Sequence, residues 1–388
     1  MSQPVPAARL GGLYGLYFAI VALAVGWFGP FFASIGFSSE QIGIAIGVLT
    51  GSKILAPYVW GYIGDHVSNR LRVVQAGMVG SLSMAFFLLT EFDFAGLCLI
   101  LFGFGLFWNA IIAQFDTLTL AYLKGQHHTY SRIRVWGSVG FIVMMLSAGW
   151  VFSWIPFDVL PLLMIAGLAA SGLLSLTLPT LEAEASSEAT PVPIWEVLRR
   201  PVVLLFFFIA AMNQFTHGPL NVFFTLYVQD VGYSAFEAGQ LWALGVFAEV
   251  VLFFVLPRYL TRLNLRHLLV LSLVLSGLRW FGTAWFVESA MILMGLQLIH
   301  AFSFGAIHAV SIEFVRRWFP GRLSGRGMAL YSGLVFGTGG ALGSLSSGYL
   351  WEALGGAQTF EWMGVLTLIT ACVAWFGLRP ARLEPQQA

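Results

Sequence analysis

The sequence is poor in charged residues and in cysteine. Only 10% of its 388 residues are Asp, Glu, Lys or Arg, whereas soluble domains carry about 25%. So few charges cannot keep a protein surface hydrated, which favours lipid as the solvent. The net charge of +1 gives no indication of a nucleic-acid or acidic partner. Both cysteines, Cys98 and Cys372, lie in apolar runs, which is more typical of packed small side chains than of a disulfide or metal pair.

The motifs of nucleotide, metal and catalytic chemistry are also missing. The sequence has no Walker loop and no dinucleotide-binding glycine pattern, and the adjacent His127 and His128 have poor spacing for a zinc site. No convergent set of catalytic side chains is evident. We therefore expect a protein that is not an enzyme, with no metal site and no cofactor.

Long apolar runs dominate the sequence, 58% of which is hydrophobic. A bilayer core of about 30 Å needs about 20 apolar residues as helix. The first run is longer than the apolar region of a signal peptide, so it is interpreted as a membrane helix that stays in the protein. Twelve runs predict an all-α integral membrane protein, and their limits are 10–33, 41–63, 72–90, 94–122, 132–154, 158–179, 201–228, 235–256, 268–286, 290–315, 327–350 and 358–378.

The longest polar stretch divides these runs into six and six. It covers residues 181–200, and it predicts an N-terminal bundle over 1–180 and a C-terminal bundle over 201–388. Two parallel six-helix halves are the plan of major facilitator transporters. All of the 19 Lys and Arg residues except Lys53 and Arg279 fall on one side of these spans. This distribution predicts that both termini are cytoplasmic.

The loop between the second and third runs carries a candidate conformational latch. Its residues Gly61, Asp65 and Arg70 match the major facilitator signature loop, while His66 and Ser68 depart from it. Glycine permits close helix approach, and an acidic group here can cap a neighbouring helix or pair with an arginine. The alternative interpretation is an ordinary polar turn with positive charge on the cytoplasmic side.

Ionisable residues inside the spans are the main candidates for function, because each costs about 2.5–3.5 kcal/mol to insert. They are Lys53, Asp116, Arg134, Glu249, Arg279, His217, His300 and His308. Several belong to polar stripes with helical spacing, which predict a shared cavity near the membrane midplane. The stripes comprise Asn109 with Asp116, Asn213 with His217 and Asn221, Trp242 with Gly245 and Glu249, and Gln297 with His300, Phe304, His308 and Ser311. Structural ion pairs or hydrogen-bonded histidines are the alternative interpretation.

From these patterns we assign provisional roles. Glu249 and His300 are the candidate proton carriers, with Arg279 as their modulating charge. Lys53 or Arg134 would hold an anionic carboxylate. Aromatic packing is assigned to Trp136, Phe141 and Trp242, and the remaining cavity-lining candidates are Asn109, Asp116, Asn213 and His217.

Several segments resemble a known transporter family over nearly the whole chain. The segments 130–141, 232–235, 241–250, 278–280 and 296–300 are similar to the phenylpropionate permease family, and the first also to its relative lactose permease. The resemblance implies proton-coupled import of a small organic solute such as an aromatic carboxylate.

Comparison with lactose permease also implies where the two differ. Asp116 and Arg134 match its sugar site, and Arg279 matches an arginine of proton coupling. Phe141 replaces its sugar-stacking tryptophan, Val246 aligns with its span-8 glutamate, and its Lys-His-Glu set in span 10 becomes Met294, Gln297 and His300. These changes disfavour sugar as the solute.

A proton symporter for sugars or nucleosides is the main alternative, and drug efflux is a weaker one. A channel fits less well, because repeated halves with buried charges are typical of carriers. The expected partners are a small-molecule solute, protons and the lipid bilayer, and the expected state is a monomer in a bacterial-type inner membrane.

Overall fold

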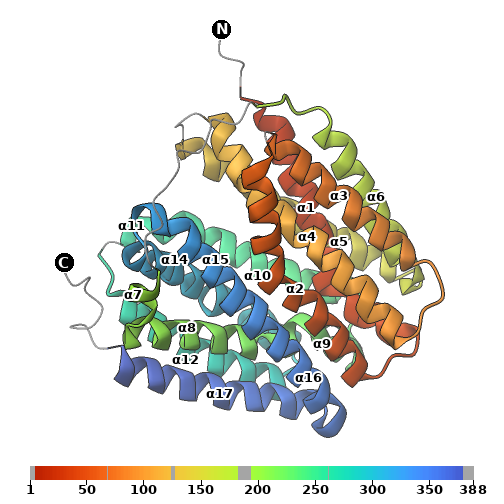
Figure 1. The fold of residues 1–388 in the computed structure, drawn as a ribbon. Coiled ribbons are helices and arrows are strands. Elements are labelled where there is room, and N and C mark those ends of the chain that lie inside the picture. Colours follow the sequence, from red (N-terminus) through yellow and green to blue (C-terminus); the bar gives the residue numbers. More distant parts are fainter. Residues whose placement is uncertain (1–4, 68, 124–126, 182–193, 261, 379–388) are drawn as a thin grey trace.

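The computed structural model describes residues 5–67, 69–123, 127–181, 194–260 and 262–378. Within these ranges the chain is helical and contains no strand. In Figure 1, helices α1 to α6 gather on one side of the molecule, and helices α7 to α17 gather on the other. The predicted linker 181–200 falls largely outside the described residues, which resume before the short helix α7 (Trp195–Leu198).

The helices follow the predicted apolar runs. Those of the first six runs are α1 (Ala7–Ser34), α2 (Ser39–His66), α3 (Arg70–Phe87), α4 (Phe94–Leu123), α5 (His127–Phe152) and α6 (Leu160–Ser175), the last preceded by η1 (Phe157–Val159). Those of the later runs are α8 (Pro201–Thr216) with α9 (Gly218–Asp230), α10 (Ala235–Val255), α12 (Leu265–Trp285), α13 (Ala290–Leu298) with η2 (Ala301–Ala306) and α14 (Ile307–Trp318), α15 (Ser324–Tyr331) with η4 (Ser332–Gly339) and α16 (Gly340–Leu354), and α17 (Gly356–Gly377). The short elements α11 (Pro257–Leu260) and η3 (Gly321–Leu323) connect them.

Eleven helical segments of the described chain are long and apolar enough to cross a bilayer. They correspond to every predicted run except the third. That run forms α3, whose 18 residues begin with Arg70 and include Arg72, and these two arginines lower its mean hydropathy. The twelve-helix all-α membrane fold predicted from the sequence is therefore the fold of the chain.

Two of the helices begin at capping boxes. Ser38 accepts from the backbone N–H of Gln41 before α2, and Ser234 accepts from that of Glu237 before α10. In each case the N3 side chain accepts the N-cap N–H in return. This arrangement satisfies backbone donors that a helix start otherwise leaves unpaired. The two boxes therefore fix where α2 and α10 begin.

The two groups of helices are in close contact at the end of the molecule that holds these capping boxes. At Gly43 of α2 an added Cβ would lie 2.6 Å from the Cα of Gly348 of α16, so only glycine fits there. The Ser39 N–H donates to Glu352 at 3.1 Å, and the Phe236 N–H donates to Ser153 at 3.1 Å. Figure 1 shows α2 and α16 side by side.

Packing is looser toward the opposite end. The buried residues of α10 all lie between Ala235 and Gly245, and its remaining turns are partly or fully exposed. The part of α10 that carries Glu249 is therefore less covered by the rest of the protein than its first turns. This places Glu249 just beyond the closed contact.

We predict that a large side chain at the closed contact separates α2 from α16. Gly43→Trp should raise the labelling rate of a cysteine placed at Ser344, which is buried at this contact. The assay would use a membrane-impermeant maleimide in a background with Cys98 and Cys372 replaced by serine.

Gly172→Trp is the matched control, because a Cβ at Gly172 meets open space. Equal labelling in the Gly43→Trp and control proteins would contradict the close approach of these helices.

Candidate functional site

A buried arginine lies at the centre of the polar site. Arg279 of α12 is 1% exposed. Its guanidinium donates to Gln297 Oε1 at 2.9 Å, to Ser303 Oγ at 3.1 Å and to His300 Nδ1 at 3.2 Å. Its charge lies 4.8 Å from the ring centre of Trp280. Buried charges need such partners, because an isolated ion in an apolar medium is strongly unfavourable.

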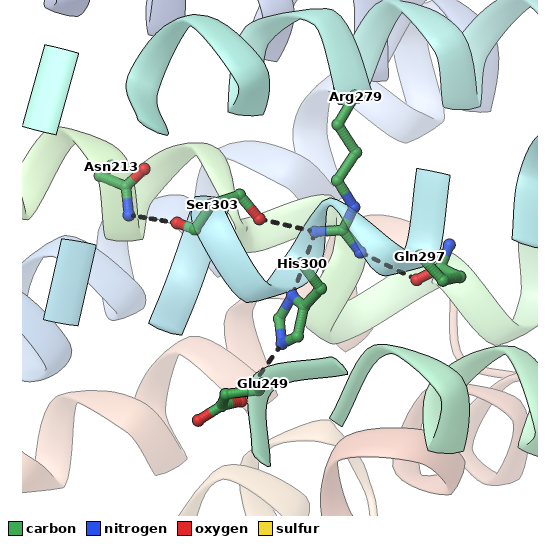
Figure 2. Close-up of polar contacts among 6 residues, drawn as sticks. All are labelled: Asn213, Glu249, Arg279, Gln297, His300 and Ser303. Carbon is green, nitrogen blue, oxygen red and sulfur yellow. Dashed lines mark hydrogen bonds and ion pairs between the residues drawn. The ribbon is translucent and has the colours of Figure 1, made fainter. Parts of the chain in front are cut away.

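The arginine determines the tautomer of His300. A guanidinium is only a donor, so the Nδ1 atom that accepts from it must be unprotonated. A neutral His300 then carries its proton on Nε2, which lies 3.7 Å from Glu249 Oε2. Figure 2 shows this chain of contacts from Arg279 through His300 to Glu249. The imidazole thus points an N–H toward a carboxylate in α10.

Local helix geometry allows these groups to meet. The span that carries Gln297 and His300 widens into the π-helical element η2, which contains Ser303. Such turns are frequent at functional sites. At Gly305 an added Cβ would lie 3.2 Å from Glu249 Cγ, so a side chain at this position would press on the carboxylate-bearing residue.

Asn213 and His217 connect the site to α8 and α9. Asn213 donates to the backbone oxygen of Ser303 at 3.2 Å, and His217 donates through Nδ1 to the backbone oxygen of Asn213 at 2.7 Å. Among the described residues, four buried polar atoms here lack a hydrogen-bond partner, namely Arg279 Nε, Asn213 Oδ1, His217 Nε2 and Gln297 Nε2. Unsatisfied buried polar groups are uncommon, and these four lie on residues that the sequence selected as candidates.

The carboxylate of Asp116 belongs to a second polar site in the first group of helices. Its Oδ1 atom accepts from the hydroxyls of Tyr14 at 2.6 Å and Tyr130 at 3.0 Å. Thr119 lies 3.3 Å from the same Tyr14 hydroxyl. Nearby in α4, Asn109 donates to Ser52 Oγ of α2 at 2.8 Å. Tyrosine hydroxyls therefore hold Asp116 in place.

Within the described residues, the two candidate carboxylate-binding cations are not paired with acidic groups. Arg134 lies 4.1 Å from the ring centre of Phe18 and 5.3 Å from that of Tyr14. In the described ranges it forms no ion pair with Asp116, although the two are electrostatic neighbours. Lys53 is half-buried where α2 packs against η4, and it too has no polar partner in the described part of the chain.

The three aromatic residues that were predicted to pack against a solute lie in different surroundings. Phe141 and Trp242 are 7% and 6% exposed and belong to one hydrophobic core cluster. The Trp242 indole donates to Thr225 Oγ1 at 3.1 Å. Trp136 is 55% exposed and lies against Gly11. The structure therefore does not gather these three rings into one open surface, and their role as a ring-binding set stays a prediction.

One expectation about the latch loop is wrong. A Cβ at Gly61 would meet open space, so no close helix approach requires glycine there. The glycine in tight contact is Gly64, where a Cβ would lie 2.8 Å from Gln114 Oε1. Arg70 donates to the same Gln114 oxygen at 3.3 Å, which connects the loop to α4. The side chain of Asp65 lies outside the described residues, so its role in the latch stays a prediction.

Some residues of the site escaped the sequence analysis. Tyr14 and Tyr130 were not distinguishable from the many other aromatic residues of the spans, and Phe18 has the sequence context of a lipid-facing side chain. Ser303 lies three residues after His300, which was the one signal that could have identified it. The π-helical turn that brings it to Arg279 has no obvious sequence signature.

Taken together, membrane-spanning helices in two groups, each with buried or half-buried charged side chains, are the architecture of a polytopic solute carrier. Residues 7–362 match the MFS_1 like family model, and the chain belongs to this family of the major facilitator superfamily. It is a multi-pass membrane transporter and not an enzyme.

Curated relatives and solved structures agree with this class. A protein of Escherichia coli (strain K12) named "Probable 3-phenylpropionic acid transporter" is 27% identical over 348 residues, covering 88% of this chain and 90% of that protein. Maltose permease of Geobacillus stearothermophilus is 26% identical, covering 68% and 67%. The crystal structure of a mutant of nucleoside transporter NupG aligns with a TM-score of 0.84 at 17% identity, covering 96% of this chain and 100% of that one, which supports the fold alone.

We predict that Arg279 depends on its acceptors for stability. Gln297→Leu should leave one guanidinium N–H unsatisfied and lower the free energy of unfolding by about 1–3 kcal/mol. The measurement is the melting temperature of the purified protein in detergent.

Gln297→Glu, which keeps an acceptor oxygen, serves as the control and should melt close to the wild type. A Gln297→Leu protein with unchanged melting temperature would show that this hydrogen bond contributes little.

Proposed function

We propose that this protein is a proton symporter that imports a small aromatic carboxylate, such as 3-phenylpropionate, by alternating access. The observation that carries the proposal is that one group of helices holds cations that are unpaired within the described residues and the other holds a carboxylate beside a histidine. Two membrane cations, Lys53 and Arg134, lie on one side and have no carboxylate partner among the described residues. The Glu249–His300 pair lies on the other. A cation can hold an anionic solute, and the carboxylate can carry a proton.

The relatives support the solute class. The name of one relative, which aligns with most of the chain, is "Probable 3-phenylpropionic acid transporter". Other relatives are named as a maltose permease and a putative nucleoside transporter, so a sugar or a nucleoside is the alternative solute, for which the tyrosine-held Asp116 supplies a polar site.

In the proposed cycle, a proton binds a Glu249 carboxylate oxygen from the outside, and the solute enters with it. The contact between α2 and α16 then closes, and both leave on the other side. Tyr14 and Tyr130 hold Asp116 throughout. We further propose two six-helix halves joined by residues 181–200, cytoplasmic termini, a latch in which Asp65 and Arg70 take part, and a monomer in a bacterial-type inner membrane.

The solute can be tested in proteoliposomes that contain a pH-sensitive dye. Addition of 3-phenylpropionate should acidify the lumen faster than in protein-free liposomes, which correct for passive entry of the protonated acid. β-Galactosides, maltose and nucleosides would be added in parallel. A response restricted to sugars or nucleosides would overturn the aromatic-acid assignment.

We predict that Glu249→Gln abolishes uptake driven by a proton gradient but spares exchange of labelled for unlabelled solute. The amide keeps the shape of the carboxyl group but cannot release a proton. Uptake and exchange would be measured with radiolabelled 3-phenylpropionate. Undiminished gradient-driven uptake would show that the proton is carried elsewhere.

A further inference from the structure

Arg134 is a membrane cation without an acidic partner in the described part of the chain. Its guanidinium packs on the rings of Phe18 and Tyr14. The nearby Asp116 accepts two tyrosine hydroxyls and forms no ion pair with it within the described residues. A guanidinium on aromatic faces keeps its N–H donors available for a planar acceptor such as a carboxylate.

The packing of α5 against α10 directs Arg134 toward the second group of helices. A Cβ at Gly239 would lie 2.5 Å from the Met145 oxygen, and a Cβ at Gly149 would lie 2.8 Å from the Ala235 oxygen. Met145 of α5 thus lies opposite Gly239 of α10, and Gly149, four residues later, lies opposite Ala235, four residues earlier. The two helices are therefore antiparallel. Continued for about three turns, this register places Arg134 opposite Glu249.

Electrostatics agrees with this placement. Arg134 lies within electrostatic range of both Glu249 and His308. The charged or titratable groups that face Glu249 are then Arg134 from α5 and His300 beside η2, with Arg279 behind the imidazole. Arg279 already has three acceptors, so of the two described arginines near Glu249 it is Arg134 that can respond to the charge on Glu249.

We propose that Arg134 serves two carboxylates in turn, that of Glu249 and that of the solute. This inference rests on the proposed aromatic-acid symport. While Glu249 is ionised, its carboxylate attracts the guanidinium of Arg134 and competes with the solute carboxylate for it. When a proton from the outer side forms an O–H bond on Glu249, the negative charge is removed and Arg134 takes the solute carboxylate. After the solute leaves, the O–H bond breaks, the proton passes to water, and Glu249 again faces Arg134. One proton accompanies each carboxylate, so transport is electroneutral.

Solute binding should therefore depend on pH through Glu249. The test is calorimetric binding of 3-phenylpropionate to the purified full-length protein between about pH 5.5 and about pH 8.5, where a carboxylic acid with a pKa of about 4 stays anionic. In the wild type, Kd should rise toward alkaline pH, by up to about tenfold per pH unit. In Glu249→Gln, Kd should equal the acidic wild-type value at every pH.

Companion variants separate the parts of the inference. Arg134→Gln should lose binding at every pH, and Arg134→Lys should bind more weakly while retaining the pH dependence. Glu361→Gln is the matched control, because Glu361 lies in α17, where it accepts from Trp285 at an exposed site, and it should leave the profile unchanged.

Each contrary outcome has a distinct meaning. A pH dependence that survives in Glu249→Gln but disappears in Asp116→Asn would assign the competing carboxylate to Asp116 and overturn this inference alone. Normal affinity in Arg134→Gln would overturn it as well. Absence of saturable wild-type binding at any pH would overturn the proposed solute class and this inference with it.

Discussion

A guanidinium within a bilayer must find its acceptors inside the protein, and Arg279 is the residue on which this constraint acts most strongly. Its three acceptors come from one span, on residues 297, 300 and 303, and a π-helical turn begins within that segment. Because the arginine can only donate, it leaves His300 with its proton facing Glu249. A structural requirement for a buried charge thereby orients the pair that we propose to carry the proton.

The two groups of helices divide the remaining chemistry. In the first group, tyrosine hydroxyls hold Asp116 while Arg134 rests on aromatic rings. In the second group, Glu249 lies just beyond the closed contact, where α10 becomes exposed. A cation in one group and a carboxylate in the other can respond to each other and to an anionic solute, which is what coupled transport requires.

Much of the fold was predictable because the physics that sets it is local. Each span needs about 20 apolar residues, and each predicted run became helical. The shared helix face of Gln297 and His300 also followed from helical spacing, and the insertion cost of charge made Arg279 a candidate. The pairing of Arg134 with aromatic rings instead of Asp116, and the burial of Phe141 and Trp242 in the core, depend on packing between distant helices. No local pattern specifies such contacts. For the same reason the sequence predicted a close helix contact at Gly61, whereas the structure has it at Gly64.

The most direct test is an experimental structure of the protein at acidic pH with 3-phenylpropionate bound. The account predicts the solute carboxylate on Arg134, with Arg279 still hydrogen-bonded to Gln297, Ser303 and His300. A carboxylate bound to Arg279, with those three contacts broken, would contradict it, because Arg279 would then be the solute site and not the internal charge that positions the Glu249–His300 pair.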